Sequence, residues 1–153
     1  MDKKEIENTM KLVIKITDQL GFPITSDDYY IEDTGCPHER PSLPDGYAAV
    51  YLFWYEPYHQ FLKIGKANVN TKTRFRYLHY GFNSNSTLAN SICNDTDFQK
   101  KGINKENVKD WMLNNLQRLS IFIKANNGKE RAVTELVESI FHYKYRPCYE
   151  GNI

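Results

Sequence analysis

This sequence of 153 residues has few cysteines, no long apolar run and no excess of charge of one sign. Its three cysteines, Cys36, Cys93 and Cys148, lie far apart and lack the paired C-x-x-C spacing of zinc sites. We therefore expect reduced thiols and a cytoplasmic protein. No apolar stretch approaches the length of a bilayer span, and residues 1–5 lack the apolar core of a signal peptide. These absences argue against secretion and against a membrane partner.

The charge balance excludes a strongly basic protein. Lys and Arg total 20 and Asp and Glu total 19, which gives a net charge of +1. Many small nucleic-acid binders instead carry a large positive charge over much of their surface. Any surface that holds nucleic acid must therefore be local here. The length fits one domain, because domains typically span roughly 100 to 200 residues.

What the chain does contain is hydrophobic periodicity of two kinds. Asp2 and Glu5 form a capping-box pattern ahead of apolar residues at helical spacing, and Gly21 ends this first helix. Residues 12–16 also alternate, so a strand there is the alternative. Further strands are expected at residues 47–55, 60–65 and 119–125, and further helices at 71–80, from 104 and from 129. The pattern predicts an α+β fold, with a small three-stranded antiparallel sheet flanked by helices and an extra N-terminal helix.

Two segments show little periodicity. Residues 22–46 contain four prolines and are expected to connect the first helix to the sheet with little regular structure. Residues 83–103 are rich in Asn, Ser, Thr and Asp, which is typical of an insertion, with one short helix near residues 88–93. We therefore divide the chain into residues 1–46, the N-terminal helix and its connection, and residues 47–153, the main domain.

The last predicted helix carries two carboxylates, and helical geometry distinguishes them. At about 100° per residue, Glu138 falls at the edge of the apolar stripe beside Phe141, whereas Glu135 points to the solvated side. A carboxylate at such a boundary is partly desolvated and can still reach a cleft. That position suits a hard divalent ion such as Mg²⁺, which keeps several of its waters. An ordinary surface glutamate is the alternative.

The order of several residues resembles the GIY-YIG nuclease domain. Tyr51 ends an Ala-Val-Tyr element on one strand, Gly65 ends a Lys-Ile-Gly element on the next strand, and Arg74 follows on a helix. Residues 137–149 are similar to the end of the nuclease domain in the bacterial excision-repair nuclease, where a leucine-glutamate pair precedes a run of basic and aromatic residues with a proline. The resemblance covers about residues 47–152.

The departures from the family pattern are also informative. Ala49 stands where the family has the first glycine of GIY, and Lys63 stands where it has the tyrosine of YIG. Lysine at this position also occurs in some GIY-YIG restriction enzymes and in a phage-related branch, so a restriction or phage-defence role is implied. The family has an asparagine directly after the tyrosine that matches Tyr149, whereas here Asn152 comes two residues later.

The resemblance implies a division of roles in phosphodiester hydrolysis. Tyr51 would position or deprotonate the attacking water, with Lys63 lowering its pKa or acting as the base itself. Arg74 would bind the scissile phosphate through its planar donor fork. Glu138 would hold Mg²⁺ or Mn²⁺ beside the leaving oxygen. His79 lies one residue after the family's position for a histidine or tyrosine that assists proton transfer, and a solvent-facing histidine is the alternative.

Basic and aromatic residues cluster in sequence around these positions. Basic side chains can hold phosphates while aromatic faces stack on bases. The candidates for substrate binding are Lys66, Lys72, Arg76, Tyr77, Tyr80 and, by resemblance, Asn152. DNA is the expected partner, with RNA as the alternative, and a homodimer would allow both strands of a duplex to be cut.

Two other functions stay open from the sequence. A nucleic-acid-binding module of the same fold, without efficient catalysis, is suggested by Ala49, Lys63 and the displaced Asn152. Such a module would bind DNA without metal-dependent cleavage. A protein-interaction domain would use the 11 tyrosines as anchors and would bind DNA weakly, with little dependence on salt.

Overall fold

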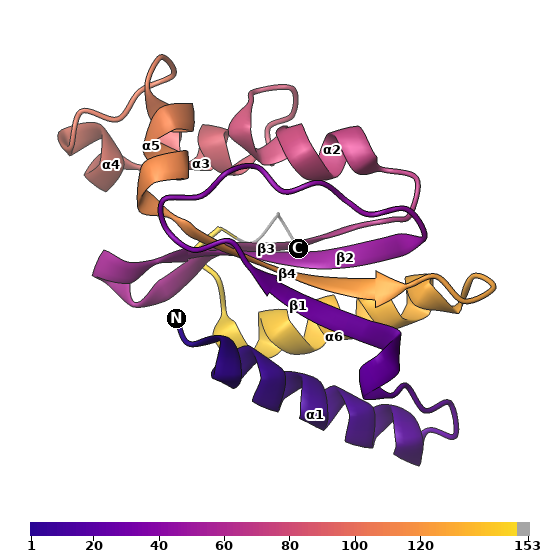
Figure 1. Ribbon diagram of the computed structural model, residues 1–153. Coiled ribbons are helices and arrows are strands. Elements are labelled where there is room, and N and C mark those ends of the chain that lie inside the picture. Colours follow the sequence, from indigo (N-terminus) through magenta and orange to yellow (C-terminus); the bar gives the residue numbers. More distant parts are fainter. Residues whose placement is uncertain (150–153) are drawn as a thin grey trace.

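The protein is a four-stranded antiparallel sheet between two layers of helices, in a computed structural model that describes residues 1–149. The helices are α1 (Lys3–Gln19), α2 (Lys72–Tyr77), α3 (Leu88–Asn94), α4 (Thr96–Lys100), α5 (Val108–Asn115) and α6 (Lys129–Tyr145). The strands are β1 (Tyr29–Asp33), β2 (Tyr47–Tyr55), β3 (Gln60–Ala67) and β4 (Gln117–Lys124), in the spatial order β1-β4-β2-β3. Short 3₁₀ turns are η1 (Ser26–Asp28), η2 (Glu56–Tyr58) and η3 (Leu78–Tyr80). Figure 1 shows α1 and α6 on one face of the sheet and α2 to α5 on the other.

The α+β prediction is confirmed, but the predicted number of strands is wrong. Residues 22–46 are not wholly irregular, because β1 lies within them and pairs antiparallel with β4 from Tyr29 opposite Ile123 to Asp33 opposite Leu119. The strand is only five residues long, and its partner follows some ninety residues later, so no local turn signal marks the pair. The division into residues 1–46 and 47–153 stays a prediction, although β1 joins the same sheet.

The predicted N-terminal helix is confirmed and the alternative strand over residues 12–16 is wrong. An Asp2 carboxylate oxygen accepts a hydrogen bond from the Lys4 backbone N–H and so caps α1, but the described residues show no return bond from the Glu5 side chain that would complete the predicted capping box. Ile6, Met10 and Val13 on its inner face are fully buried against the sheet and α6. Each such side chain stabilises the fold by roughly 1.5–3 kcal/mol relative to exposure.

The helix expected over residues 71–80 is shorter than predicted. Regular α-helix ends at Tyr77, and the chain tightens into η3. The tighter turn buries His79 and Tyr80 and leaves Leu78 only half-buried. In residues 83–103 the expected short helix is present as α3, and α4 was not predicted.

The two faces of the sheet differ in chemistry. The face against α1 and α6 is apolar, with Leu52 and Ile121 at its centre. The face against α2 to α5 is also packed with apolar and aromatic residues, but buried polar side chains lie among them, including Lys63, His79, Arg118 and Ser120. Buried polar groups need partners, so this second face is where a functional site is expected.

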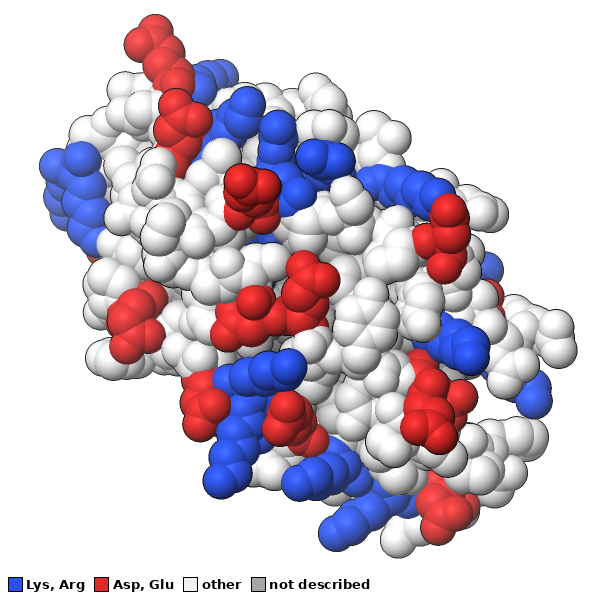
Figure 2. Space-filling view, viewed as in Figure 1, with Lys and Arg blue, Asp and Glu red and all other residues white. Residues whose placement is uncertain are grey.

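The molecular surface agrees with the small net charge. On the face seen in Figure 2, basic and acidic side chains are interspersed and do not form one continuous field of a single sign. Among the helices of residues 1–149, none is long and apolar enough to cross a membrane.

Candidate functional site

Tyr51 lies in the middle of β2 and faces the α2 to α5 layer. Its direct neighbours across the sheet are Gly65 on β3 and Ser120 on β4. A Cβ atom added at Gly65 would lie only 2.7 Å from Tyr51 Oη, so the tyrosine ring rests directly over the glycine. The glycine of the Lys-Ile-Gly element therefore has a steric role. It lets the Tyr51 ring lie over β3, the edge strand of the sheet.

The hydroxyl of Tyr51 is hydrogen-bonded to His79, whose Nε2 lies 2.5 Å from Oη. The other ring nitrogen, Nδ1, accepts the backbone N–H of Leu88 at 3.3 Å. A backbone N–H can only donate, so Nδ1 carries a lone pair and the proton of the neutral ring is on Nε2. His79 therefore donates to Tyr51 Oη, and the hydroxyl proton of Tyr51 points away from the histidine.

Electrostatics agrees with this assignment of protons. Burial is the largest cause that lowers the pKa of His79, and together with the charges of Lys63, Arg118 and Arg74 it brings this pKa to about 3. Burial also raises the pKa of Tyr51 to about 12, while the positive charges of Arg118 and Arg74 oppose the rise. At neutral pH the pair is therefore an imidazole and a phenol. Both cations stabilise the deprotonated form of Tyr51.

Lys63 and Arg74 reach the same region from different elements. Lys63 lies on β3 opposite Phe53, which puts it one side-chain row from Tyr51 on the same face, and it is 8% exposed. Arg74 projects from the exposed side of α2. Within residues 1–149 no hydrogen bond or ion pair engages its guanidinium, although its charge acts on both Tyr51 and His79. An unengaged guanidinium beside buried donors is suited to binding an anion.

Glu138 lies around the edge of the sheet from Tyr51. The predicted contrast along α6 is confirmed, because Glu138 is half-buried whereas Glu135 is exposed and pairs with Arg131 at 3.3 Å. The Glu138 carboxylate accepts a hydrogen bond from Lys66 Nζ at 2.6 Å. Its charge raises the pKa of Tyr51, so it is electrostatically coupled to the tyrosine.

The surroundings of Glu138 bear on whether a metal ion fits there. Among the described residues no group of three or more His, Cys, Asp or Glu side chains lies together. Mg²⁺ does not need one, because it commonly binds one or two carboxylates and completes its shell with waters and substrate phosphates. The side chain of Glu138 is 21% exposed, so its oxygens are accessible to an ion, but Lys66 would have to give up its contact. The carboxylate can thus be one oxygen ligand of a hydrated divalent ion only where that ion displaces the Lys66 ammonium.

The residues predicted to bind substrate divide into three groups. Lys66, Lys72 and Arg76 are at the surface, but each has a partner: Glu138, Asp45 and Ser42, respectively. Tyr77 is 45% exposed, and Arg40 lies 4.6 Å from the centre of its ring. Tyr80 is buried and cannot offer a ring face to a base, so its predicted stacking role is wrong. Asn152 lies outside the described residues.

Sequence reasoning missed Arg118 and His38. Arg118 is fully buried in β4, donates to Tyr80 Oη at 3.1 Å and to the Phe75 carbonyl at 3.0 Å, and lies under the Tyr51 ring. His38 comes from the proline-rich connection and hydrogen-bonds the same Tyr80 hydroxyl at 2.7 Å. Arg118 did carry a signal, because it alternates with Ser120 and Phe122 and so must share their inward face. The position of His38 had no local signal.

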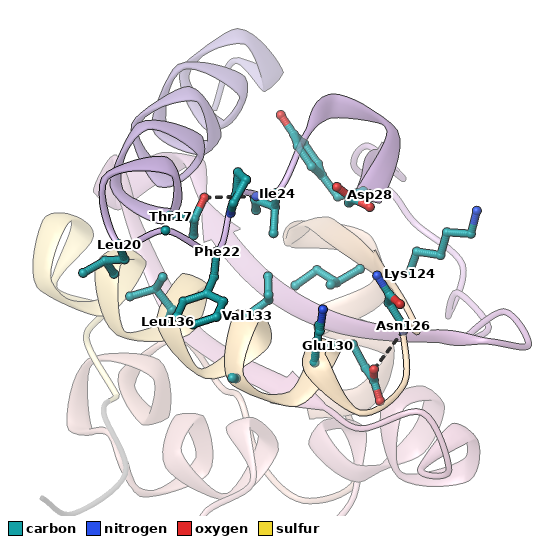
Figure 3. Close-up of a pocket in the computed structure, with 16 residues that line it drawn as sticks. Thr17, Leu20, Phe22, Ile24, Asp28, Lys124, Asn126, Glu130, Val133 and Leu136 are labelled. Carbon is teal, nitrogen blue, oxygen red and sulfur yellow. Dashed lines mark hydrogen bonds between the residues drawn. The ribbon is translucent and has the colours of Figure 1, made fainter.

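Two of the hollows on the surface of the described residues differ in their relation to this site. An apolar pocket of about 530 Å³ opens between the end of α1 and the start of α6, where Leu20, Ile24, Val133 and Leu136 contribute to its walls (Figure 3). None of the predicted site residues lines it. A second hollow of about 590 Å³ follows the start of α2 and includes Lys72 and Arg74. Of the other predicted catalytic residues, Tyr51, Lys63, His79 and Glu138, none lines this second hollow.

Comparisons of the chain with protein-family models, with curated proteins and with solved structures found no match. The chemistry of the site is therefore inferred from its own geometry. Tyr51, His79, Lys63 and Arg74 meet on one face of the sheet, and Glu138 reaches the same edge from the other face. Such a set can bind an anion, orient a water molecule and hold a divalent cation.

Proposed function

We propose that this protein is a metal-dependent DNA endonuclease of the GIY-YIG type, which hydrolyses phosphodiester bonds. The observation that carries the proposal is the hydrogen-bonded Tyr51–His79 pair, on which the charge of Arg74 acts and to whose tyrosine Glu138 is electrostatically coupled. Tyr51, Arg74 and Glu138 are separated by up to 87 positions in sequence. The charges of Arg74 and Glu138 nevertheless both act on the pKa of the Tyr51 hydroxyl.

The side chains divide the work of hydrolysis as follows. Arg74 binds a non-bridging oxygen of the scissile phosphate and neutralises charge that develops there. Tyr51 orients the attacking water through Oη, and once ionised it accepts the proton of that water. His79 donates its Nε2–H to the same oxygen and so stabilises the phenolate. Glu138 would hold Mg²⁺ or Mn²⁺, which would supply charge stabilisation for the leaving oxygen.

The identity of the base determines the pH dependence. With a pKa of about 12, Tyr51 is a phenol at neutral pH, so the fraction of phenolate increases tenfold with each pH unit. If Tyr51 is the base, the cleavage rate rises with pH throughout the neutral and mildly alkaline range. Lys63 is the alternative base, because it is buried on the same face next to His79.

A second candidate function is a nucleic-acid-binding module without catalysis. The contact between Lys66 and Glu138 favours it, because the ammonium already neutralises the carboxylate that a metal would need. This module would bind DNA through Arg74, Arg76 and Tyr77 with a strong dependence on salt. It would not cleave DNA with any divalent metal ion.

The test is cleavage of supercoiled plasmid in Mg²⁺ or Mn²⁺. Glu138→Gln and Tyr51→Phe are expected to lower the rate by about 10²–10³-fold, which is the usual cost of removing one group that acts in the transition state. Glu135→Gln and Arg131→Ala are matched controls on the exposed side of α6 and are expected to cut at the native rate. Circular dichroism checks that each variant is folded. If the native protein cuts no substrate but binds DNA, the binding-module function replaces this one.

A further inference from the structure

Arg118 is a fully buried cation with no acidic partner among the described residues. Within residues 1–149 the structure gives it no carboxylate partner, and its Nε has no hydrogen bond. Its two terminal nitrogens donate to Tyr80 Oη and to the Phe75 carbonyl, which are neutral acceptors. A buried charge without a counter-ion is expensive compared with an apolar side chain of similar volume. Packing alone therefore does not explain an arginine at this position.

The hydrogen bonds beyond Tyr80 do not neutralise the charge either. The Tyr80 hydroxyl accepts from Arg118 and can donate its single proton to His38 Nε2 at 2.7 Å. The opposite ring nitrogen of His38 then donates to the Leu116 carbonyl at 2.6 Å. Every proton in this chain is accounted for with a neutral phenol and a neutral imidazole. The positive charge of Arg118 is therefore not neutralised by Tyr80 or His38, and it affects the ionisation of the groups next to the guanidinium.

The groups closest to the Arg118 guanidinium are aromatic rings that pack around Tyr51 in the candidate site. The guanidinium carbon is 4.5 Å from the ring centre of Phe75, 5.1 Å from Phe53 and 5.6 Å from Tyr51. These rings hold the cation through their electron-rich faces. In the sheet, Arg118 and Lys63 flank Phe53 on opposite sides, in the side-chain row next to Tyr51. These neighbours hold the Arg118 guanidinium beneath the Tyr51 ring but do not neutralise its positive charge.

We propose that Arg118 is a positioning residue of this site, whose buried charge stabilises the anion formed at Tyr51 Oη and keeps His79 a neutral N–H donor to that oxygen. The inference rests on the proposed function for its role in turnover. Tyr51 first loses its proton to solvent. The phenolate then takes a proton from the attacking water as that water's oxygen bonds to phosphorus, and the leaving oxygen takes a proton from solvent. Four other titratable groups face Tyr51: Lys63 from β3, Arg74 from α2, His79 from η3 and Glu138 from α6.

The electrostatic role can be measured without any assay of cleavage. Difluorotyrosine incorporated at position 51 ionises at lower pH than tyrosine and reports its ionisation by ¹⁹F NMR. The folded protein is titrated as the native chain and as Arg118→Met and Arg118→Lys. Removing a charge this close is expected to raise the pKa of the fluorinated phenol by about one to two units. Arg118→Lys keeps the charge, so it is expected to restore most of the native value although it loses the guanidinium geometry.

Two results would overturn the proposal. One is a folded Arg118→Met protein whose fluorotyrosine pKa equals that of the native chain. The other is a large rise of the fluorotyrosine pKa in Tyr80→Phe. This milder variant removes one hydrogen bond of Arg118 but leaves its charge in place. This variant remains available if Arg118→Met does not fold, and the pKa is expected to stay within about half a unit of native. A rise as large as that expected for Arg118→Met would show that packing, and not charge, sets the ionisation of Tyr51.

The experiments distinguish a failure of the nuclease function from a failure of the proposed role of Arg118. If the fluorotyrosine pKa shifts as expected but no variant or native protein cuts DNA, the electrostatic role of Arg118 stands and the nuclease function falls. If the native protein cuts DNA, Arg118→Met is expected to lose about 10–100-fold in rate at neutral pH, and Arg118→Lys to recover most of it. Equal rates in native and Arg118→Met proteins would remove Arg118 from the mechanism while leaving the nuclease function intact.

Discussion

Replacing Gly65 by alanine tests the steric basis of the site with the smallest possible change. The added Cβ would lie 2.7 Å from Tyr51 Oη and 2.8 Å from two carbons of its ring, inside any normal contact distance. Tyr51 must then tilt away from β3, which also breaks its 2.5 Å hydrogen bond to His79. Overpacking of this kind costs about 1–3 kcal/mol, and the lost hydrogen bond adds about 1 kcal/mol.

Urea denaturation of the native chain and of Gly65→Ala measures this cost. Gly81→Ala is the matched control, because the nearest atom to its Cβ is 4.0 Å away and its φ of −131° suits any residue. That variant is expected to be neutral or slightly stabilised. In a Tyr51→Val background the cost of Gly65→Ala is expected to fall close to zero, because the clashing ring is gone. A cost that is equally large in both backgrounds would refute the steric explanation.

Three further predictions concern protonation, metal binding and the DNA surface. The pKa of His79 lies near 3, below the unfolded value of about 6.5, so its contribution to stability is complete above pH 6.5 and is lost as pH falls toward 3. The free energy of unfolding of His79→Gln, followed by urea denaturation across this range, is therefore expected to fall less on acidification than that of the native chain, by several kcal/mol at most. An equal fall would contradict the assignment of a buried neutral imidazole. Lys66→Met removes the ammonium from Glu138 and is expected to tighten Mn²⁺ binding about tenfold by calorimetry; unchanged affinity would mean that the ion binds elsewhere. Arg76→Ala is expected to weaken DNA binding and to lower the salt slope by about one, and an unchanged slope in a fluorescence-anisotropy titration would remove Arg76 from the DNA surface.

Local sequence patterns were sufficient for the elements whose neighbours in space are also neighbours in sequence. Asp2 and the helical spacing after it predicted α1, and the β2–β3 pair was predicted because a short turn joins two apolar runs. Local patterns did not predict β1, because its partner β4 comes much later in the chain and the prolines around it obscure the strand. Long-range pairing depends on the assembled sheet, so no window of sequence contains it.

The candidate site shows the same division. The boundary position of Glu138 on α6 follows from helical geometry, and the resemblance pointed to Tyr51, Gly65 and Arg74. The inward turn of His79 did not follow from the sequence, because it depends on the change from α-helix to 3₁₀ turn after Tyr77. A shift of one residue around a helix moves a side chain by about 100°, which is the difference between solvent and core.

The inner faces of α1, α6, β2 and β3 can be read from the amino-acid order alone, because 3.6-residue and two-residue periodicities are local properties of the backbone. Three contacts depend instead on the assembled fold: the Tyr51 ring rests over Gly65, His79 donates to the Tyr51 hydroxyl, and the buried Arg118 guanidinium lies beneath the ring. These contacts join β2, β3, β4 and η3. They exist only once the sheet is assembled and water is excluded, because burial is what makes a proton on one ring depend on a charge in another strand.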